Sequence, residues 1–374
     1  MGIDAIFNAH NWSVVPFHFW SLVFFSLGCI IGSFLNVCIH RMPREMSIIT
    51  PRSHCPHCKY SIPWYLNLPL ATWLALRGRC KNCGAPISPR YFIVELLTGI
   101  AFLGCWLTFG RADQPLPSLL LALVYAGFLS GLIVATFIDF EHLIIPDEIT
   151  IGGMAAGFVA SFFLPTLHGA SRMNIGLLHS VVGAVAGAGT VYAILRPGKW
   201  LFGRQRVKLP VETKIVFGET AVHLPGKEIA YEELFYRQSD AIVLQARTVE
   251  LVDRGYRDVL VRLSPSALEI GGEKFNPDEV PCLEAVSSEI LLPREAMGLG
   301  DVKFMGAIGA FIGWQGVVFS LMISSMIGAA VGVTLIVMRR REWSSRMPYG
   351  PYIALAAAIW IFGGKKIIQA IFQD

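Results

Sequence analysis

Long apolar runs are the feature that most constrains how this chain folds. A segment needs about 20 consecutive apolar residues to cross a bilayer as a helix. The chain offers eight candidates, which are residues 17–38, 91–109, 117–138, 149–165, 175–195, 302–313, 315–338 and 350–372. They predict an all-α polytopic membrane protein with about eight transmembrane helices. The first apolar run is longer than the core of a secretory signal, so we expect this span to be retained.

The composition fits a membrane protein and makes its few charges informative. Hydrophobic residues make up 54% of the 374 and charged residues only 16%, whereas a soluble domain carries about a quarter charged residues. Of the 27 acids, 15 lie between Lys199 and Arg294, so each acid elsewhere is a candidate for function. The net charge of +4 is modest and gives no reason to expect a nucleic-acid partner.

Basic residues in the short loops predict the orientation in the membrane. Residues 40–90 carry eight Lys and Arg side chains against Glu45 alone. Because short cytoplasmic loops are enriched in Lys and Arg, we expect this loop and "RRRE" at 339–342 to face the cytoplasm, with both chain ends outside. Lys365 and Lys366 fall late in the last span. Either they reach the outer surface along their flexible stems, or that span ends earlier.

A segment of different character interrupts the apolar runs. The stretches "TKIVFGETAVHL", "AIVLQARTVELV" and "DVLVRLS" are rich in β-branched residues and are separated by Gly, Pro and Asp-Arg-Gly. That pattern is typical of short strands joined by turns. We therefore expect a small β-rich cytoplasmic insert over 197–295, with helical character limited to 228–238.

Four of the eight cysteines have the spacing of a metal site. They form "CPHC" (Cys55, Cys58) and "CKNC" (Cys80, Cys83), with 21 residues between the pairs. Two such pairs fit a tetrahedral zinc ion held by four thiolates. Disulfides or redox pairs are the alternative, but the predicted cytoplasmic side is reducing. We expect a structural zinc, because four thiolates leave no open coordination position and a short polar loop needs the folding free energy.

Four acids lie near the predicted inner ends of spans. Asp139, Glu141 and Asp147 follow the third apolar run, and Asp301 begins the sixth. An ionised acid within a bilayer costs a few kcal/mol or more, so such acids tend to be functional. The predicted threading puts Asp139 and Asp301 on the same face of the membrane. For Asp147, which follows a proline, a role at a helix start is the plainer interpretation, and we expect Glu141 to be solvated.

Two carboxyls brought together can hydrolyse a peptide bond. Like charges a few Å apart do not both ionise, so the pair shares a proton. The ionised partner takes a proton from water, and the protonated one supplies a proton to the leaving amine. Gly298 and Gly300, just before Asp301, permit close approach of a peptide. Lys303 could instead neutralise Asp301, but residues two apart on a helix do not face each other. We expect Asp301 to do proteolytic work with a second acid on the same side of the membrane, and spacing alone leaves open which acid that is.

Taken in order, these motifs resemble those of the bacterial type IV prepilin peptidases, the G-x-G-D aspartic proteases of pilus and type II secretion systems. The resemblance is carried by "GSFLNVCIHRMP", "SHCPHC", "IDFEHLIIPDEIT" and "MGLGDVKFMGAIGAFIGW", and it covers nearly the whole chain apart from about 199–292. It implies an inner-membrane enzyme that cuts a short basic leader from prepilins or pseudopilins after a glycine, at the cytoplasmic side. Asp139 and Asp301 match the catalytic positions.

The resemblance also implies N-methylation of the new N-terminal residue, with S-adenosylmethionine as the donor, by the region 32–90. Glu45 and Arg52 are candidates there. Glu95 is a buried acid for which helix packing is as good an interpretation as function. The family usually has a short loop where this chain has its insert. The β-like pattern of the insert favours an interaction module with an unidentified partner, but gating of access and plain decoration stay open.

These predictions divide the chain into five parts. They are a first transmembrane helix (1–39), a cytoplasmic zinc-binding, methyltransferase-associated domain (40–90), a transmembrane peptidase part with the first catalytic Asp (91–196), the β-rich insert (197–295) and a transmembrane peptidase part with the GxGD motif (296–374). Two alternatives stand beside this reading. One is a peptidase that does not methylate, which a methyl-transfer assay would reveal. The other is a transport or scaffold protein in which the acids conduct protons or pack between helices. In that case, mutating Asp139 or Asp301 separately would not alter leader cleavage.

Overall fold

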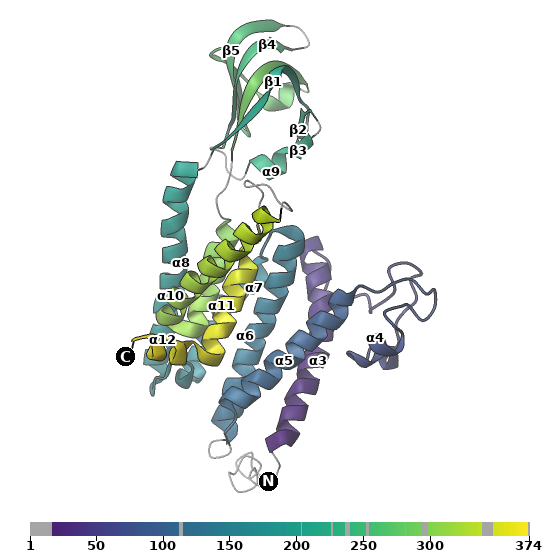
Figure 1. Cartoon of the computed structure of the whole chain (residues 1–374), viewed down its shortest axis with the longest axis vertical. Coiled ribbons are helices and arrows are strands. Elements are labelled where there is room, and N and C mark those ends of the chain that lie inside the picture. The colour runs from purple at the N-terminus through teal and green to yellow at the C-terminus, as the bar shows by residue number, and fades with distance from the viewer. Residues whose placement is uncertain are drawn as a thin grey trace. The chain divides into compact units, whose positions relative to one another are not determined.

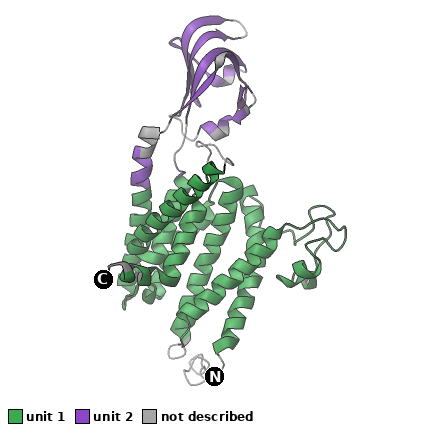
Figure 2. Cartoon of the chain, in the orientation of Figure 1, with its two compact units in different colours: residues 1–191, 299–374 green, residues 192–298 purple. Residues whose placement is uncertain are grey.

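The computed structural model divides the chain into two compact units, residues 1–191 with 299–374 and residues 192–298 (Figure 2). The structure describes residues 17–111, 115–202, 204–225, 227–235, 240–251, 254–280, 282–293, 298–338 and 347–372. The predicted cytoplasmic loop at 339–342 and both chain ends lie outside the described residues.

The first unit is built from apolar helices (Figure 1). In chain order the longer ones are α3 (Phe17–Arg41), α5 (Pro89–Phe109), α6 (Pro115–His142), α7 (Asp147–Phe163), α8 (Met173–Phe202), α10 (Leu299–Val337), α11 (Gly350–Ile359) and α12 (Lys365–Phe372). Within the described part of the chain, five segments are long and apolar enough to cross a membrane, namely Phe17–Arg44, Pro89–Phe109, Leu116–His142, Met173–Pro197 and Leu299–Val337. The chain is therefore a helical membrane protein with a β-sheet insert.

The other predicted spans differ from this set. The run 149–165 folds as α7, which has 17 residues. The runs 302–313 and 315–338 are both part of α10, whose backbone leaves helical geometry at Gly313 (φ 71°, ψ 175°). Glycine has no Cβ and adopts a positive φ without steric cost, so the break falls at the residue between the two predicted runs. Eight separate spans are thus not confirmed.

The last predicted span, 350–372, is wrong as a single helix. The apolar helix that begins at Gly350 ends at Gly364, after a π-helical turn over Trp360–Gly364. Lys365 then begins α12, and Figure 1 shows α12 leaving the line of α11. The reason is chemical, because two adjacent lysines are costly within hydrocarbon and favour a helix that turns away from the apolar run.

Glycines let the helices pack closely. A Cβ added at Gly28 or Gly32 of α3 would lie 2.7 Å from the α5 backbone, at Thr98 O and Glu95 Cα respectively. Gly183 of α8 lies in equally tight contact with Gly309 of α10. Small residues at such crossings let backbones approach where no hydrophobic effect drives helices together. The packing therefore brings α3 to α5 and α8 to α10, and the latter contact holds the helix that carries Asp301.

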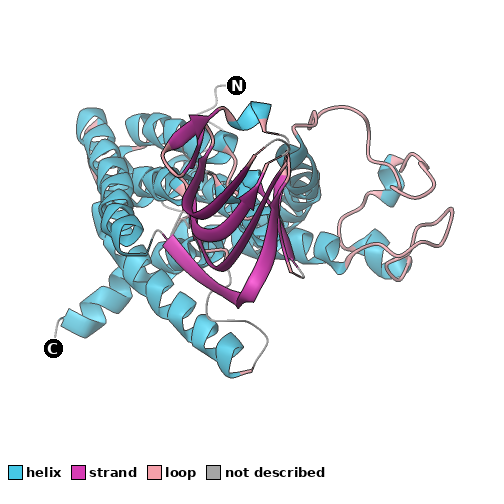
Figure 3. Cartoon of the chain, turned by 90° about the horizontal axis from the view of Figure 1, so that it is seen from above, coloured by secondary structure: helices cyan, strands magenta, loops and turns pink. Residues whose placement is uncertain are grey.

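Residues 42–88 form a loop domain between α3 and α5, and Figure 3 shows them mostly as irregular chain. Its helices are short, with α4 spanning Ala71–Ala75. The buried Arg41 at the end of α3 donates to the carbonyls of Ser47 (2.8 Å) and Pro51 (2.6 Å). At the other end, Ser88 is the N-cap of α5 and its Oγ accepts the N–H of Arg90 (3.3 Å). Both ends of the loop domain are therefore fixed to the helices.

The second unit contains one antiparallel sheet of eight strands in the order β3-β2-β1-β8-β4-β5-β6-β7. The strands are β1 (Arg204–Phe217), β2 (Ala221–Leu224), β3 (Lys227–Ala230), β4 (Ile242–Glu250), β5 (Gly255–Ser264), β6 (Ala267–Ile270), β7 (Glu273–Phe275) and β8 (Leu283–Pro293). The β-rich prediction for the insert is confirmed. Within the predicted helix over 228–238, residues 228–230 pair in β3 and Tyr231–Leu234 form α9, while 236–238 lie outside the described residues.

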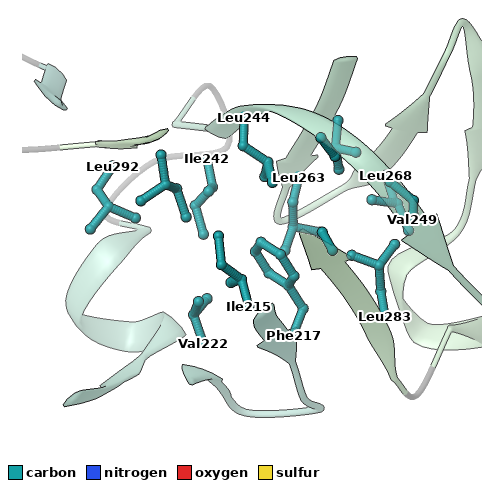
Figure 4. Close-up of a cluster of buried hydrophobic side chains, with 14 of the residues drawn as sticks. Ile215, Phe217, Val222, Ile242, Leu244, Val249, Leu263, Leu268, Leu283 and Leu292 are labelled. Atoms are coloured by element: carbon teal, nitrogen blue, oxygen red, sulfur yellow. The ribbon is translucent and has the colours of Figure 1, made fainter. Parts of the chain in front are cut away.

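Alternating side chains build the core of this sheet. Along β4 the buried residues alternate with more exposed ones, which is the two-residue period of a strand with one covered face. Ile215, Phe217 and Leu283 meet Ile242 and Leu244 in one apolar cluster (Figure 4). The strands that open and close the insert, β1 and β8, pair along most of their length. The insert therefore leaves and rejoins the helical unit through two neighbouring strands.

Candidate active site and metal centre

The four predicted metal-ligand cysteines lie together. The Sγ atoms of Cys55, Cys58, Cys80 and Cys83 all lie within 4.8 Å of one another. The distances are 3.9 Å from Cys55 to Cys83 and 4.0 Å from Cys58 to Cys80. Four sulfurs placed tetrahedrally at 2.3 Å from zinc would be about 3.8 Å apart. The cluster therefore fits zinc, and all four side chains are free of disulfides.

The two cysteine pairs adopt the same local fold. In the first, the N–H of Lys59 donates to Cys55 O (2.9 Å); in the second, the N–H of Gly84 donates to Cys80 O (2.9 Å). Lys59 (φ 58°) and Gly84 (φ 70°) occupy the same left-handed position after the second cysteine. Each turn thus points two thiols at one centre, and the C-x-x-C spacing dictates this geometry locally.

Hydrogen bonds favour the thiolate form that zinc requires. The Asn82 side-chain amide donates to Cys58 Sγ (3.5 Å) and lowers the pKa of that thiol to about 6. The backbone N–H of Cys83 lowers the pKa of Cys80. A thiolate is the metal-binding form of cysteine, so these two thiols favour cation binding, whereas desolvation and the neighbouring thiols raise the pKa of Cys83 to about 11.

Glu95 connects the loop domain to the bundle. Its side chain is on α5, only 8% of the residue is exposed, and Oε2 accepts the backbone N–H of Leu70 (2.8 Å). Leu70 has a positive φ of 59° directly before α4. The sequence indicated Glu95 as a buried acid but did not predict its partner. The partner is a backbone N–H 25 residues away, and a backbone N–H cannot be recognised from the type of residue that carries it.

Asp139 lies in the last turn of α6 and is almost fully buried, with 5% of the residue exposed. Its Oδ2 accepts the backbone N–H of Gly350 (2.9 Å), the first residue of α11. The first N–H groups of a helix have no partner within the helix, and the helix dipole attracts negative charge to this end. The α11 N-terminus therefore provides a hydrogen-bond donor for the Asp139 carboxylate. The sequence indicated the carboxylate but not this donor.

Asp301 is in the first turn of α10, and Gly300 precedes it. A Cβ added at Gly300 would lie 3.7 Å from the Cβ of Ile145, and one added at Gly350 would lie 3.2 Å from Ile145 Cδ1. Ile145 is thus a common neighbour of the glycine beside Asp301 and of the glycine bonded to Asp139. Through Ile145, the chain segment beside Asp301 therefore lies near the segment bonded to Asp139, and the pairing of the two acids stays a prediction. Gly298 directly precedes α10 in the chain.

The two supporting charges pair with each other. Lys303 Nζ donates to Asp147 at 2.7 Å (Oδ1) and 2.9 Å (Oδ2). Lys303, which the sequence also offered as a partner of Asp301, is thus engaged with Asp147 on another helix. Asp147 is the first residue of α7, as its position after a proline predicted. Both side chains of the pair are substantially exposed, 42% for Lys303 and 58% for Asp147, so the pair tethers α7 to α10 at the rim of the site.

Glu141 is exposed, in agreement with the expectation that it is solvated, and it forms an ion pair with Arg90 at the start of α5. This pair joins the end of α6, two residues beyond Asp139, to the end of the cysteine-containing loop. The loop domain and Asp139 therefore lie at the same end of the helical unit.

A cavity of about 270 Å³ lies between α6, α7 and α10. Its lining is apolar and includes Gly131, Ile149, Gly153 and Phe304. Phe304 is three residues after Asp301, which is about one helical turn. The cavity is therefore close to the acid site along α10 and offers room for apolar groups.

The fold and the site define a helical membrane protein with acids at one end of its helical unit and a separate four-cysteine cluster in the neighbouring loop. The comparisons with known proteins agree. The profile of the bacterial peptidase A24 N-terminal domain matches residues 26–109, and that of the type IV leader peptidase family matches 126–209 and 281–333. The chain belongs to the type IV leader peptidase family, which confirms the resemblance seen in the motifs.

Some curated relatives align with nearly the whole chain, and another aligns with a shorter part of it at higher identity. A prepilin leader peptidase/N-methyltransferase of Aeromonas hydrophila is 29% identical over 95% of this chain and 94% of its own length. One of Stutzerimonas stutzeri is 26% identical over 93% and 92%. A protein of the same name from Myxococcus xanthus is 46% identical, over 38% of this chain and 41% of its own. No solved structure is significantly similar to the chain.

Proposed function

We propose that this protein cleaves the leader peptide of type IV prepilins or pseudopilins and N-methylates the new N-terminus. Family membership and relatives that span nearly the full length support this activity. The observation that carries the proteolytic half is Asp139, a buried carboxylate at the end of an apolar helix. Gly350, whose N–H donates to Asp139, shares the neighbour Ile145 with Gly300.

In the proposed reaction, Asp139 and Asp301 act as one pair that shares a proton. The ionised carboxylate takes a proton from water as the water oxygen attacks the scissile carbonyl carbon. The protonated carboxyl hydrogen-bonds the carbonyl oxygen. When the C–N bond breaks, a proton passes to the leaving amine, which becomes the new N-terminus. The products are a leader carboxylate and an amine, so atoms and protons balance without any metal.

The backbone around Asp301 suits a peptide substrate. Gly298 and Gly300 present no side chain, so an extended segment can lie against the chain there. The apolar cavity between α6, α7 and α10 is close to this point and lined by groups such as Gly153 and Phe304. We propose that this cavity receives the apolar side chains that follow the scissile bond. The basic leader then stays on the aqueous side of Asp139 and Asp301.

We propose that the acids face the cytoplasm. The ion pair between Glu141 and Arg90 puts the end of α6 beside the loop domain. That loop carries an excess of Lys and Arg, and such loops stay on the cytoplasmic side. A leader exposed in the cytoplasm would then meet Asp139 and Asp301 at the membrane boundary.

The methyl-transfer half is assigned to the loop domain. Cys55, Cys58, Cys80 and Cys83 would hold a structural zinc that fixes its fold, with no catalytic coordination position. S-adenosylmethionine would supply the methyl group, as the family resemblance implies. The Glu95 carboxylate holds Leu70, and with it the chain before α4, against α5. This contact sets where the loop domain sits on the helical unit.

One experiment reports both activities. The purified full-length protein is incubated with a synthetic prepilin and S-adenosylmethionine, and the N-terminus of the product is mapped by mass spectrometry. We expect cleavage after a single glycine and a mass increase of one methyl group on the new N-terminal residue. Cleavage without the methyl group would favour the peptidase-only alternative, and an intact substrate would favour a transport or scaffold protein.

A further inference from the structure

The start of α11 has one backbone donor that is not used within its own helix. Pro351, its second residue, has no N–H. The N–H groups of Tyr352 and Ile353 both donate to the carbonyl of Tyr349 (3.1 and 3.3 Å). The N–H of Gly350 donates to Asp139 Oδ2 (2.9 Å). The hydrogen-bonding pattern of this turn therefore directs one donor at the acid.

The same turn is anchored from a second helix. The hydroxyl of Tyr349 lies within hydrogen-bond distance of Ser324 Oγ (3.0 Å) and Ser325 Oγ (3.1 Å), both on α10. Two consecutive residues thus contact the two helices that carry the acids: Tyr349 reaches α10 and Gly350 reaches α6. The donor is fixed in space by a contact on each side, as a positioning group requires.

Position 350 has no room for a side chain. A Cβ added there would lie 2.8 Å from Asp139 Oδ2 and 3.2 Å from Ile145 Cδ1. The backbone at Gly350 has no positive φ, so alanine is allowed on conformational grounds. The restriction is therefore contact with the carboxylate and with Ile145, and not helix geometry.

We propose that Gly350 is a positioning residue for Asp139, and that its bare N–H holds the carboxylate in the orientation that proteolysis needs. This inference rests on the proposed function. It adds a third chain segment to the site, one that lies beyond the last residue of the family match, 333. Asp139 would then be held by α11, while Asp301 is presented by α10.

The test compares Gly350→Ala with the wild type in the full-length protein. Leader cleavage of a synthetic prepilin gives kcat and KM, and methyl transfer to a pre-cleaved peptide gives an internal measure of folding. We expect kcat for cleavage to fall about 100-fold, because a displaced catalytic group costs about this much. KM should stay within about twofold, and methyl transfer should be unchanged. Gly152→Ala on α7, where an added Cβ meets no atom within 4 Å, is the matched control and should behave as wild type.

A second variant separates the two contacts of an added Cβ. Ile145→Val removes Cδ1, so Gly350→Ala with Ile145→Val relieves the contact with Ile145 but keeps the one with Asp139. We expect no recovery of kcat in this double variant. Recovery to near the wild-type rate, a kcat for Gly350→Ala within threefold of wild type, or a parallel loss of methyl transfer would each overturn the inference. A wild-type protein that leaves the prepilin intact would overturn the proposed function, and this inference with it.

Discussion

Lys303 and Asp147 form a two-point ion pair, with Nζ at 2.7 and 2.9 Å from the two carboxylate oxygens, between the first turn of α10 and the first residue of α7. The pair connects two helices that meet beside the proposed site. The pair also distinguishes Asp147 from Asp139. Asp147 forms an ion pair at the exposed rim, whereas Asp139 is buried.

Asp147→Asn should therefore leave proteolysis largely intact. An exposed ion pair contributes about 0–1 kcal/mol, so we expect the cleavage rate to stay within about fivefold of wild type. The measurement is kcat/KM on a synthetic prepilin, with Lys303→Met as the matched change on the other partner. A loss as deep as that of Asp139→Asn would contradict this division and give Asp147 a direct part in the reaction.

The cysteine loop should contain one zinc per chain. We expect Cys55→Ser to lower the zinc content and to reduce methyl transfer much more than leader cleavage, because the acids are outside the loop. Elemental analysis of the purified protein and the two activity assays check this. Cys282→Ser is the control, since Cys282 is exposed in the insert and outside the cluster. Equal losses in both activities would show that the loop supports the whole enzyme.

Zinc loading should depend on pH in one direction. The hydrogen bond from Asn82 lowers the pKa of Cys58 from 9.0 to about 6. A lowered pKa in the folded loop favours folding at high pH, and this contribution is lost as the pH falls through about 6. Protons then also compete with zinc for the thiolate. We expect zinc to be released as the pH falls, which a chromogenic chelator follows. Asn82→Ala should shift that release to higher pH.

The prediction for Glu95 concerns its contact with the loop domain. Glu95→Ala leaves the Leu70 N–H without its partner, a loss of about 1–3 kcal/mol for a buried donor. We expect weaker methyl transfer and near-normal cleavage. Glu95→Gln keeps an acceptor oxygen and should retain most of the methyl transfer. If the two variants lose methyl transfer equally, the charge and not the hydrogen bond is what this position requires.

Residue types predicted the cysteine cluster well, but they did not predict the backbone donors that contact the buried acids. Both cysteine turns are local, so the C-x-x-C spacing fixes their geometry before any long-range contact forms. The link from Gly350 to Asp139 joins residues 211 positions apart, and its donor is a backbone N–H that every residue but proline carries. The Glu95–Leu70 contact was missed for the same reason. Residue identity marks side chains that do chemistry, but not the backbone groups that orient them.

The fold shows the same division. Apolar runs located the helices to within a few residues, because burial in lipid dictates composition along each one. The number of spans is not confirmed, since α7 has 17 residues and the apolar helix that begins at Gly350 ends at Gly364, before two lysines. In the insert, strand character was visible in the sequence. The pairing of β1 with β8 was not, because it joins segments from opposite ends of the insert.

The most direct test of the central claim is the rate of leader cleavage in the single variants Asp139→Asn and Asp301→Asn, measured by mass spectrometry on a synthetic prepilin. General acid–base groups contribute about 10²- to 10⁴-fold, so each change should reduce cleavage by at least the lower figure while methyl transfer to a pre-cleaved peptide continues. If either variant trims the prepilin at the wild-type rate, the two carboxyls do not act as one catalytic pair.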